Sequence, residues 1–352
     1  PHKALPGGAA SPQQRLDMAV LATAELGKRA EVLDVELRRG GPSYSWETLC
    51  MMKEQYPEDE IFLLMGSDMF LTLQDWRESR QVMSMARIGA FSRMQGGEEA
   101  AFARQKAFLE REYGADVTVI PNPQVVELSS TEVRQALAQD LLPAAVYGYV
   151  LREKLYGTHM SLTGLTPDAL RPIALSYLKP KRMPHVLGTE QEAVRLVRRY
   201  GGDETQARIA ALLHDCTKKL DMPEQLALCA EYGIGLDELE QKALKLLHSK
   251  TGAAIARRVF GVGDAVYDAI WYHTTGKPDM TRLEKIIYLA DYIEPSRDFP
   301  GVEELRKAVY EDLDHGLLLG LSMTIQEMEE MGNPVHHLTR DARDYLLKRG
   351  IR

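Results

Sequence analysis

The sequence has little cysteine and none of the patterns that would pair it. Its 352 residues include three cysteines, Cys50, Cys216 and Cys229, and no two of them have the CxxC spacing. This usage is typical of a reducing compartment, so we expect a cytoplasmic protein. Apolar runs of membrane-spanning length and a signal-peptide pattern are also absent from the sequence, which argues against a membrane partner.

The sequence also has fewer basic than acidic residues. The chain has 43 Lys and Arg residues against 51 Asp and Glu residues, and its net charge is −8. A nucleic-acid-binding face needs clustered positive charge to replace counterions, so we expect no nucleic-acid partner. The net charge does not argue against small phosphorylated ligands, because a local group of cations can bind them on an acidic protein. The hydrophobic content of 45% is that of a globular protein, and the length fits two domains better than one.

The first half of the chain alternates between two kinds of pattern. Short apolar runs rich in β-formers occur at residues 31–37, 61–65, 88–91 and 117–120, and helical patterns occur at residues 13–29, 46–55, 97–113 and 131–139. Alternating strands and helices predict a mostly parallel sheet covered by helices. Ligands bind such sheets beyond the carboxyl ends of the strands, so the loops that follow strands are the places to search.

The pattern changes after Tyr156. Residues 157–166 are polar and contain glycine and threonine, and we interpret them as a linker between domains at 1–156 and 167–352. Thr166 followed by Pro167 predicts the start of a helix. Beyond it no strand is predicted, and helical patterns occur at residues 190–200, 204–218, 223–231, 236–247, 252–260, 264–272, 282–292 and 302–331. The second half is therefore predicted to be all-α.

Six residues of this helical half can bind metal ions. They are four imidazoles and two carboxylates: His185, His214, Asp215, His248, His273 and Asp291. His214 and Asp215 are adjacent at the end of an apolar helical run, where a buried His–Asp pair is costly without partners. Four nitrogen donors and two carboxylates suffice for two transition-metal ions, with Asp215 shared between them.

The ligand types also indicate the metal and the chemistry. Imidazole combined with carboxylate favours iron, manganese or cobalt over magnesium, which prefers oxygen ligands. Two such ions activate water and clamp the phosphate oxygens around a reacting phosphorus. The helical half is therefore predicted to be a metal-dependent phosphohydrolase with two divalent transition-metal ions, iron being the first choice.

At these residues a family resemblance becomes specific. His185, the His214–Asp215 pair and Asp291 resemble the HD superfamily of metal-dependent phosphohydrolases, and the added His248 and His273 are similar to its two-metal branch. Residues 289–297 (LADYIEPSR) and 273–276 (HTTG) closely resemble the bacterial symmetrical diadenosine tetraphosphate hydrolases of this superfamily. The resemblance covers residues 166–348. It implies an all-α HD domain that cleaves diadenosine tetraphosphate at its middle into two ADP.

Three cations of the helical half are candidates for binding phosphate. Lys218 lies four residues after His214, which predicts that both side chains lie on one helix face. We assign Lys218, together with Asp215, to the catalytic residues, with Lys218 binding the phosphate that is cleaved; a surface lysine is the alternative. Lys250 and Arg297 are the candidates for holding the rest of the polyphosphate. The three remaining histidines of this half are interpreted as structural or surface residues: His315, His336 and His337.

Three motifs stand out in the first half. Residues 41–49 (GPSYSWETL) are a turn that feeds a helix, and residues 65–69 (MGSDM) end an apolar strand, with Trp76 a short distance on. Residues 128–134 (LSSTEVR) start a helix, where free N–H groups, hydroxyls and a guanidinium can bind phosphate. Each motif also has a purely structural interpretation: Ser45 can cap a helix, and Ser129 with Glu132 can form a capping box.

In this order the three motifs strongly resemble the bacterial nicotinate mononucleotide adenylyltransferases, over residues 1–156. The resemblance implies an α/β Rossmann-like nucleotidyltransferase domain that uses magnesium with ATP. Residues matching the motif for ATP phosphates are Ser129, Ser130, Thr131 and Arg134. Residues matching the nicotinate-nucleotide side are Tyr44, Ser45, Asp68 and Trp76, and His2 and Lys3 match the family's Pro-His-Lys segment near the phosphates.

The sequence departs from this family in two ways. Ser45 stands where the family usually has threonine. The family's first strand, with the Gly-rich loop and its His-x-x-His signature, is expected before Pro1, so the α/β domain is expected to be incomplete, with an open sheet edge. Those histidines stabilise charge during adenylyl transfer. We therefore expect little or no transfer by this chain, whereas a complete parent protein would be bifunctional.

Other interpretations remain open. The HD domain could act on another nucleotide, such as a nucleoside monophosphate or a cyclic dinucleotide, beside a non-catalytic nucleotide-binding N-terminal module. A purely structural role of the helical half would predict that it holds no metal. The expected partners are therefore small nucleotides: diadenosine tetraphosphate, ATP and nicotinate mononucleotide. The sequence leaves the oligomeric state open, with a homodimer as one alternative.

Overall fold

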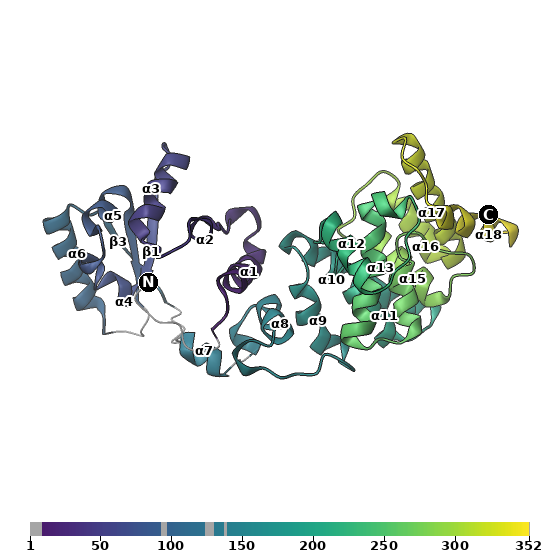
Figure 1. The fold of residues 1–352 in the computed structure, drawn as a ribbon, viewed down its shortest axis with the longest axis horizontal. Helices are drawn as coiled ribbons and strands as arrows, with labels where there is room; N and C mark the ends of the chain where they lie inside the picture. Colours follow the sequence, from purple (N-terminus) through teal and green to yellow (C-terminus); the bar gives the residue numbers. More distant parts are fainter. Residues whose placement is uncertain (1–8, 93–96, 124–129, 137–138, 352) are drawn as a thin grey trace. The chain divides into compact units, whose positions relative to one another are not determined.

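The computed structural model describes residues 9–92, 97–123, 130–136 and 139–351 of the chain (Figure 1). Contacts between Cα atoms divide the chain into two compact units. The first unit contains Pro1–Leu16 and Val32–Ala138, and the second contains Asp17–Glu31 and Gln139–Arg352. Each unit has its own core.

The first unit is built on a three-stranded parallel sheet. Its strands are β1 (Phe62–Gly66), β2 (Arg87–Phe91) and β3 (Val117–Ile120), in the order β1-β2-β3. Leu63 pairs with Ile88, which pairs in turn with Val117. The helices of this unit are α2 (Val35–Arg39), α3 (Ser45–Gln55), α4 (Ser67–Phe70), α5 (Ser79–Met85), α6 (Glu99–Tyr113) and α7 (Ser130–Ala136), with a 3-10 turn η2 (Leu73–Asp75).

Alternation along the strands separates a covered face from an exposed one. Ile88 and Val117 are buried in a core that also contains Phe70 from α4 and Leu109 from α6. On the other face Leu64 keeps 61% of its surface exposed and Phe62 is also exposed, whereas Val119 is exposed on the same face as Val117. Successive strand residues point to opposite faces. Among the described residues, helices therefore cover one face of this sheet.

The predicted strands near residues 61–65, 88–91 and 117–120 are confirmed, but the strand predicted at residues 31–37 is wrong. That segment has no regular structure up to Asp34, and α2 follows it. Arg38 donates to the Asp34 carboxylate at 2.9 Å, four residues back. Such a pair supports a helical turn. No described strand pairs with this segment to hold it extended.

The second unit is helical, and its described residues contain no strand. Its long helices are α8 (Ala144–Arg152), α9 (Pro167–Ser176), α10 (Met183–Tyr200), α11 (Glu204–Leu213), α12 (Met222–Glu231), α13 (Leu244–Phe260), α14 (Asp264–Trp271), α15 (Arg282–Ile293), α16 (Val302–Glu311), α17 (Leu313–Glu330) and α18 (His337–Lys348). Short 3-10 turns are η1 (Ala24–Arg29), η3 (Gln139–Leu141), η4 (Leu155–Gly157), η5 (Pro180–Arg182) and η6 (Glu240–Lys242), and α1 (Pro12–Ala22) spans the division between the units. No described helix is both long and apolar enough to cross a membrane.

Side-chain caps mark the starts of several helices in this unit. The Thr166 hydroxyl accepts the backbone N–H of Ala169, as the sequence predicts. Asp221 and Thr281 each form a reciprocal capping box with the Glu three residues later. Such caps satisfy N–H groups that have no partner inside the helix.

Two helix predictions are wrong in how they divide the chain, while α10 and α13 begin earlier, and α11 ends earlier, than predicted. The helix predicted at 236–247 is instead a turn at η6 followed by α13, so His248 lies inside a helix and does not open one. The helix predicted at 302–331 breaks at Asp312, whose side chain accepts the N–H of His315 and starts α17. Asp caps a new helix here because its short side chain competes for backbone N–H groups.

The contacts of α8 indicate where the helical unit begins. Helix α8 packs tightly on α9, since a Cβ at Gly148 would overlap the Pro172 carbonyl. The stretch from Gln139 to Tyr156 therefore belongs to the helical unit by its contacts. The boundaries predicted from the sequence, 1–156, 157–166 and 167–352, stay a proposal about domain limits.

Three helices form the centre of the helical unit and position the candidate site. Helix α10 packs on both α11 and α15, which also contact each other. The apolar run predicted at the end of α11 is buried, and Leu212 and Leu213 have no exposed surface. The chain leaves α11 at this point, so the residues that follow are held inside the core.

Candidate metal centre

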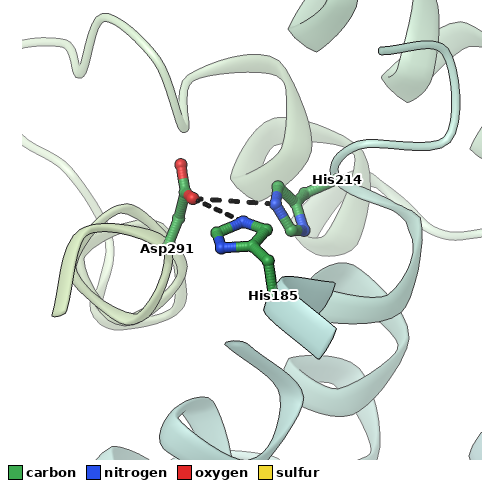
Figure 2. Close-up of side chains that lie close together, drawn as sticks. All are labelled: His185, His214 and Asp291. Carbon is green, nitrogen blue, oxygen red and sulfur yellow. Dashed lines mark ion pairs between the residues drawn. The ribbon is translucent and has the colours of Figure 1, made fainter. Parts of the chain in front are cut away.

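The structure brings the six predicted metal ligands together. The first group contains His185, His214 and Asp291 (Figure 2). The Oδ1 atom of Asp291 lies 3.0 Å from Nε2 of His185 and 3.8 Å from Nε2 of His214. The two imidazoles and the carboxylate come from three different helical segments and point toward a common centre.

The second group consists of His248 and His273, which lie beside Asp215. The Oδ1 atom of Asp215 is 3.2 Å from Nε2 of His248 and 3.9 Å from Nε2 of His273. Its Oδ2 atom is 3.6 Å from Nε2 of His214 and 3.9 Å from Nε2 of His185. Each carboxylate oxygen of Asp215 therefore faces a different pair of imidazoles, which is the placement required of a carboxylate shared by two ions.

The ligands are placed by the ends and first turns of helices. His185 lies in the first turn of α10, and His214 with Asp215 follow the end of α11. His273 follows α14, and Asp291 lies on α15. Helix ends present side chains to a common centre because the chain changes direction there.

Hydrogen bonds orient three of the four imidazoles. The Nδ1 atom of His214 lies 2.6 Å from the carbonyl of Ala211, and that of His273 lies 2.6 Å from the carbonyl of Ile270. The Nδ1 atom of His185 lies 2.9 Å from a carboxylate oxygen of Glu294. Each Nδ1–H donates to its acceptor, so each Nε2 carries a lone pair directed at the centre.

Burial makes this arrangement costly without a cation. His214 and Asp215 have no exposed surface, and His248 and His273 are 2% exposed. Among the described residues, no hydrogen bond satisfies Nε2 of His185, Nε2 of His214 or Oδ1 of Asp215. Buried polar atoms normally have partners. The donor set and its unsatisfied atoms therefore fit a divalent metal centre.

The pKa shifts leave the ligands in their metal-binding forms at neutral pH. Burial lowers the pKa of His248 and of His273 to about 4, and it also lowers the pKa of His214. Burial alone would raise the pKa of Asp215, but the neighbouring His214, His248 and Lys218 hold it well below its usual value. Neutral imidazole and ionised carboxylate are the forms that coordinate metal ions.

Three cations lie at the partly exposed side of the centre. Lys218 Nζ is 2.9 Å from Nε2 of His248, and Arg297 is 2.5 Å from Asp291. Arg182, which the sequence reasoning missed, is 2.5 Å from Oδ2 of Asp215. Their side chains keep between 26% and 35% of their surface exposed, so solvent reaches the centre past them. Arg182 stands three residues before His185, which is the spacing of one helical turn and could have signalled it.

Two predictions about the lysines need correction. Helix α11 ends at Leu213, so Lys218 reaches the centre from a turn and not from the same helix face as His214. Lys250 is not brought to the centre, because its Nζ pairs with Glu240 at 2.5 Å. It lies two residues after His248 on α13, and residues at that spacing point to different sides of a helix.

A third group of potential ligands contains a helix cap. Asp237, His336 and His337 lie close enough to hold an ion. Nδ1 of His336 accepts the backbone N–H of Leu338 and caps α18, which gives this residue a structural role. Its Nε2 faces Asp237 and Glu240 at 3.3 Å each but forms no hydrogen bond among the described residues. His315 and His337 are exposed, and the absence of metal binding by these three histidines stays a prediction.

Part of the predicted N-terminal site can be located. His2, Lys3 and Ser129 lie outside the described residues, and Ser130 begins α7 without a described side chain. Arg134 Nη2 lies 3.4 Å from Oγ1 of Thr131 on the same helix.

The remaining residues of that predicted site lie around the sheet. Asp68 lies two residues beyond the end of β1, on α4, and Trp76 packs against the sheet core. Tyr44 lies beneath Arg77, while Ser45 is the first residue of α3 and makes no capping bond with its side chain. The structural interpretation of Ser45 as a cap is therefore wrong.

Comparisons with known proteins agree with the two units. Residues 182–296 match the family model described as "HD domain", and residues 1–136 match the one described as "Cytidylyltransferase-like". The chain therefore combines a cytidylyltransferase-like domain containing a small parallel sheet with a helical HD domain. A Bacillus subtilis protein named "Bis(5'-nucleosyl)-tetraphosphatase, symmetrical" is 39% identical over 45% of this chain and 85% of its own length. Through its HD domain the chain belongs to the family of symmetrical bis(5'-nucleosyl)-tetraphosphatases.

Two further relatives extend the match. A Mycoplasma pneumoniae protein named "Probable nicotinate-nucleotide adenylyltransferase/Ap4A hydrolase" is 29% identical and covers 82% of this chain, with 76% of its own length matched. A crystal structure of a predicted HD superfamily hydrolase involved in NAD metabolism, from Clostridium acetobutylicum, has 43% identity and a TM-score of 0.51. It covers 53% of this chain and 98% of its own. The same pairing of two domains thus occurs in a relative.

The Glu294 carboxylate is expected to position His185 for metal binding. Gly188 leaves room for it, because a Cβ there would overlap the carboxylate. Glu294→Ala removes the acceptor of the Nδ1–H, and we expect metal affinity to fall roughly 10- to 100-fold. Glu294→Gln keeps an acceptor oxygen and should lose less. Affinity is measured by competition with a chelator, and bound metal by elemental analysis.

The matched control is Glu192→Ala. Glu192 is an equally buried carboxylate that accepts the Tyr310 hydroxyl at 2.6 Å, outside the cluster. It should keep its metal affinity even if it loses stability. Equal affinities in the Glu294→Ala and Glu192→Ala proteins would contradict the positioning role.

The metal-free protein is expected to lose stability as the pH falls from 7 to 5. In the unfolded chain His248 and His273 take up protons near pH 6.5, whereas in the folded chain their pKa values are about 4. The unfolded state therefore binds more protons between these values, and unfolding becomes more favourable as the pH falls. The melting temperature in the presence of a chelator tests this. A His248→Asn variant should show a smaller decrease, and an unchanged melting temperature of the parent protein between pH 7 and 5 would contradict the expectation.

Proposed function

We propose that the helical unit hydrolyses diadenosine tetraphosphate symmetrically to two ADP, using two divalent transition-metal ions. The observation that carries this proposal is Asp215, whose two oxygens face two separate pairs of imidazoles. The substrate and the symmetrical cleavage are supported by the relative that shares 39% identity and carries that name.

Iron is the proposed metal, with manganese or cobalt as alternatives. The first group would hold one ion through His185, His214 and Asp291, and the second would hold another through His248 and His273, with Asp215 common to both. When bound, such ions supply Lewis acidity toward phosphate oxygens and water. Mixed imidazole and carboxylate ligands support these metals over magnesium.

The chain's own cations complete the site by binding phosphate. Lys218, Arg182 and Arg297 lie beside the ligands and keep part of their surface exposed. Guanidinium groups bind phosphate oxygens in a fork, and an ammonium group acts as a point charge. Lys218 would hold the phosphate that is cleaved, because it lies between His248 and Asp215. The two arginines would hold the neighbouring phosphates, a role the sequence reasoning had assigned to Lys250.

Hydrolysis of diadenosine tetraphosphate by iron- or manganese-loaded protein tests this proposal. We expect ADP as the sole nucleotide product, separated by chromatography. Asp215→Asn should lower kcat/KM by a factor of about 1000 or more, since it removes the shared ligand. Lys218→Met should lower kcat/KM about 10- to 100-fold while the protein keeps its metal, because a charged hydrogen bond to phosphate is lost.

Lys245→Met is the control, because Lys245 is an exposed residue of α13 outside the cluster. Formation of AMP and ATP would contradict the symmetrical cleavage. The proposed substrate would be wrong if metal-loaded protein left diadenosine tetraphosphate intact but hydrolysed a nucleoside monophosphate or a cyclic dinucleotide.

For the first unit we infer nucleotide binding without efficient adenylyl transfer by this 352-residue polypeptide. Its sequence contains no His-x-x-His segment, and such histidines stabilise the charge that develops in that reaction. Thr131 and Arg134 on α7 support binding of ATP phosphates with magnesium, and Asp68 after β1 supports binding of nicotinate mononucleotide. Loops after the strands of a parallel sheet are the usual ligand sites.

Calorimetry with magnesium and ATP tests the first unit. We expect Arg134→Gln to weaken binding about tenfold or more, because a charge-assisted contact to phosphate is lost. Arg104→Gln on the exposed side of α6 should leave binding unchanged. Pyrophosphate release with nicotinate mononucleotide should not exceed background. A release that depends on both substrates would refute the inference.

A further inference from the structure

The helical unit contains a cavity of about 700 Å³ that none of the six candidate metal ligands lines. Cys216 and Thr217, which follow Asp215 directly, form part of its wall, together with Lys219. The segment that carries Asp215 toward the metal centre therefore presents other residues to this cavity. A volume of this size is in the range of sites for small organic ligands.

The cavity contains a half-buried ammonium group without a counter-ion. Lys219 makes no ion pair or hydrogen bond with any residue in the described part of the chain, and burial lowers its pKa, with the nearby Arg152 adding to the effect. An unpaired, partly desolvated ammonium group is costly. A bound anion would remove that cost.

The acidic groups nearest to Lys219 are already engaged elsewhere. Asp17 accepts the hydroxyl of Tyr149 at 2.9 Å, and Glu153 pairs with Arg152 at 2.9 Å. Glu224 accepts the backbone N–H of Asp221 in the capping box of α12. None of them lies within ion-pair distance of Lys219, so its charge remains available to a ligand.

A second cation lies at the rim of the cavity on a strained backbone. Lys154 is exposed, takes a left-handed conformation with φ of 52°, and has no ion pair within the described ranges. Tyr156, two residues on, also has a positive φ of 55°. Such conformations cost energy in residues with a side chain and occur preferentially at ligand-binding segments. This turn points to a ligand-binding role for the segment.

Other residues that line the cavity are apolar or aromatic. Their side chains come from α12, α13, Tyr177 and the segment before α9: Leu162, Tyr177, Leu228, Ile255 and Val259. Arg152 lies between the rings of Tyr149 and Tyr177 and donates to the carbonyl of Ser176, so it is fixed in place as part of the wall. The cavity thus combines a cationic side with an apolar side.

We propose that this cavity is a second nucleotide site, which binds a nucleoside monophosphate with its phosphate at Lys219 and Lys154 and its base against the apolar wall. A phosphate joined to a flat, weakly polar ring matches both sides of the cavity at once. The site is separate from the metal centre and goes beyond the proposed hydrolysis. It is linked to that centre, since Thr217 donates to the carbonyl of His248 at 3.0 Å.

Binding of AMP to the full chain, with metals removed by a chelator, tests this site. Removal of metals keeps phosphate from being captured at the metal centre, and the readout does not depend on hydrolysis. By calorimetry we expect Lys219→Gln to weaken AMP binding about tenfold or more. Val259→Trp, which fills the cavity, should abolish the same binding event. Lys245→Gln, at an exposed position on α13, should leave it unchanged.

Ligand fragments and a folding check complete the test. Adenosine and inorganic phosphate should each bind at least tenfold more weakly than AMP. Melting temperatures of the variants show whether each protein is folded, and Lys219→Gln alone decides the outcome if Val259→Trp does not fold. Absence of AMP binding, AMP binding equal in Lys219→Gln and the parent protein, or either fragment binding as tightly as AMP would overturn the proposal. A parent protein that binds AMP as expected but does not hydrolyse diadenosine tetraphosphate would contradict the proposed function and still support this second site.

Discussion

The helical unit depends on a carboxylate that has no exposed surface. Asp215 is ionised at neutral pH and lies among His214, His248 and Arg182. A buried charge of this kind persists only where the surrounding groups compensate it. Helices α10, α11 and α15 supply that compensation by packing their ends and first turns around one point. The same arrangement that makes the carboxylate tolerable also gives it the surroundings of a candidate metal ligand.

The two units differ in how completely their apolar side chains are buried. In the helical unit residues 210–217 are all buried, and this buried run includes His214 and Asp215 of the candidate metal centre. In the described part of the first unit, one face of the sheet packs on helices while Leu64 and Phe62 on the other face are exposed.

Much of the candidate site could be predicted because its signals are local. An adjacent His–Asp pair after a buried apolar run is unusual enough to mark a site, and the three strands carry clear apolar runs. The partners that depend on tertiary contacts could not be predicted. Glu294 meets His185 across 109 residues, and Lys250 turns to Glu240 because of its helix face. Residues 31–37 have the composition of a strand, but strand formation also needs a neighbour, which sequence composition does not reveal.

The spread of the ligands over five segments, from α10 to α15, has a consequence for metal exchange. An ion held by His185, His214 and Asp291 would add to the hydrogen bond by which His185 already joins α10 to Glu294. His214 is fully enclosed, so the partly exposed side with Arg182, Lys218 and Arg297 is the side from which such an ion would enter or leave. Its removal would weaken the packing of several segments at once, although they are far apart in the sequence.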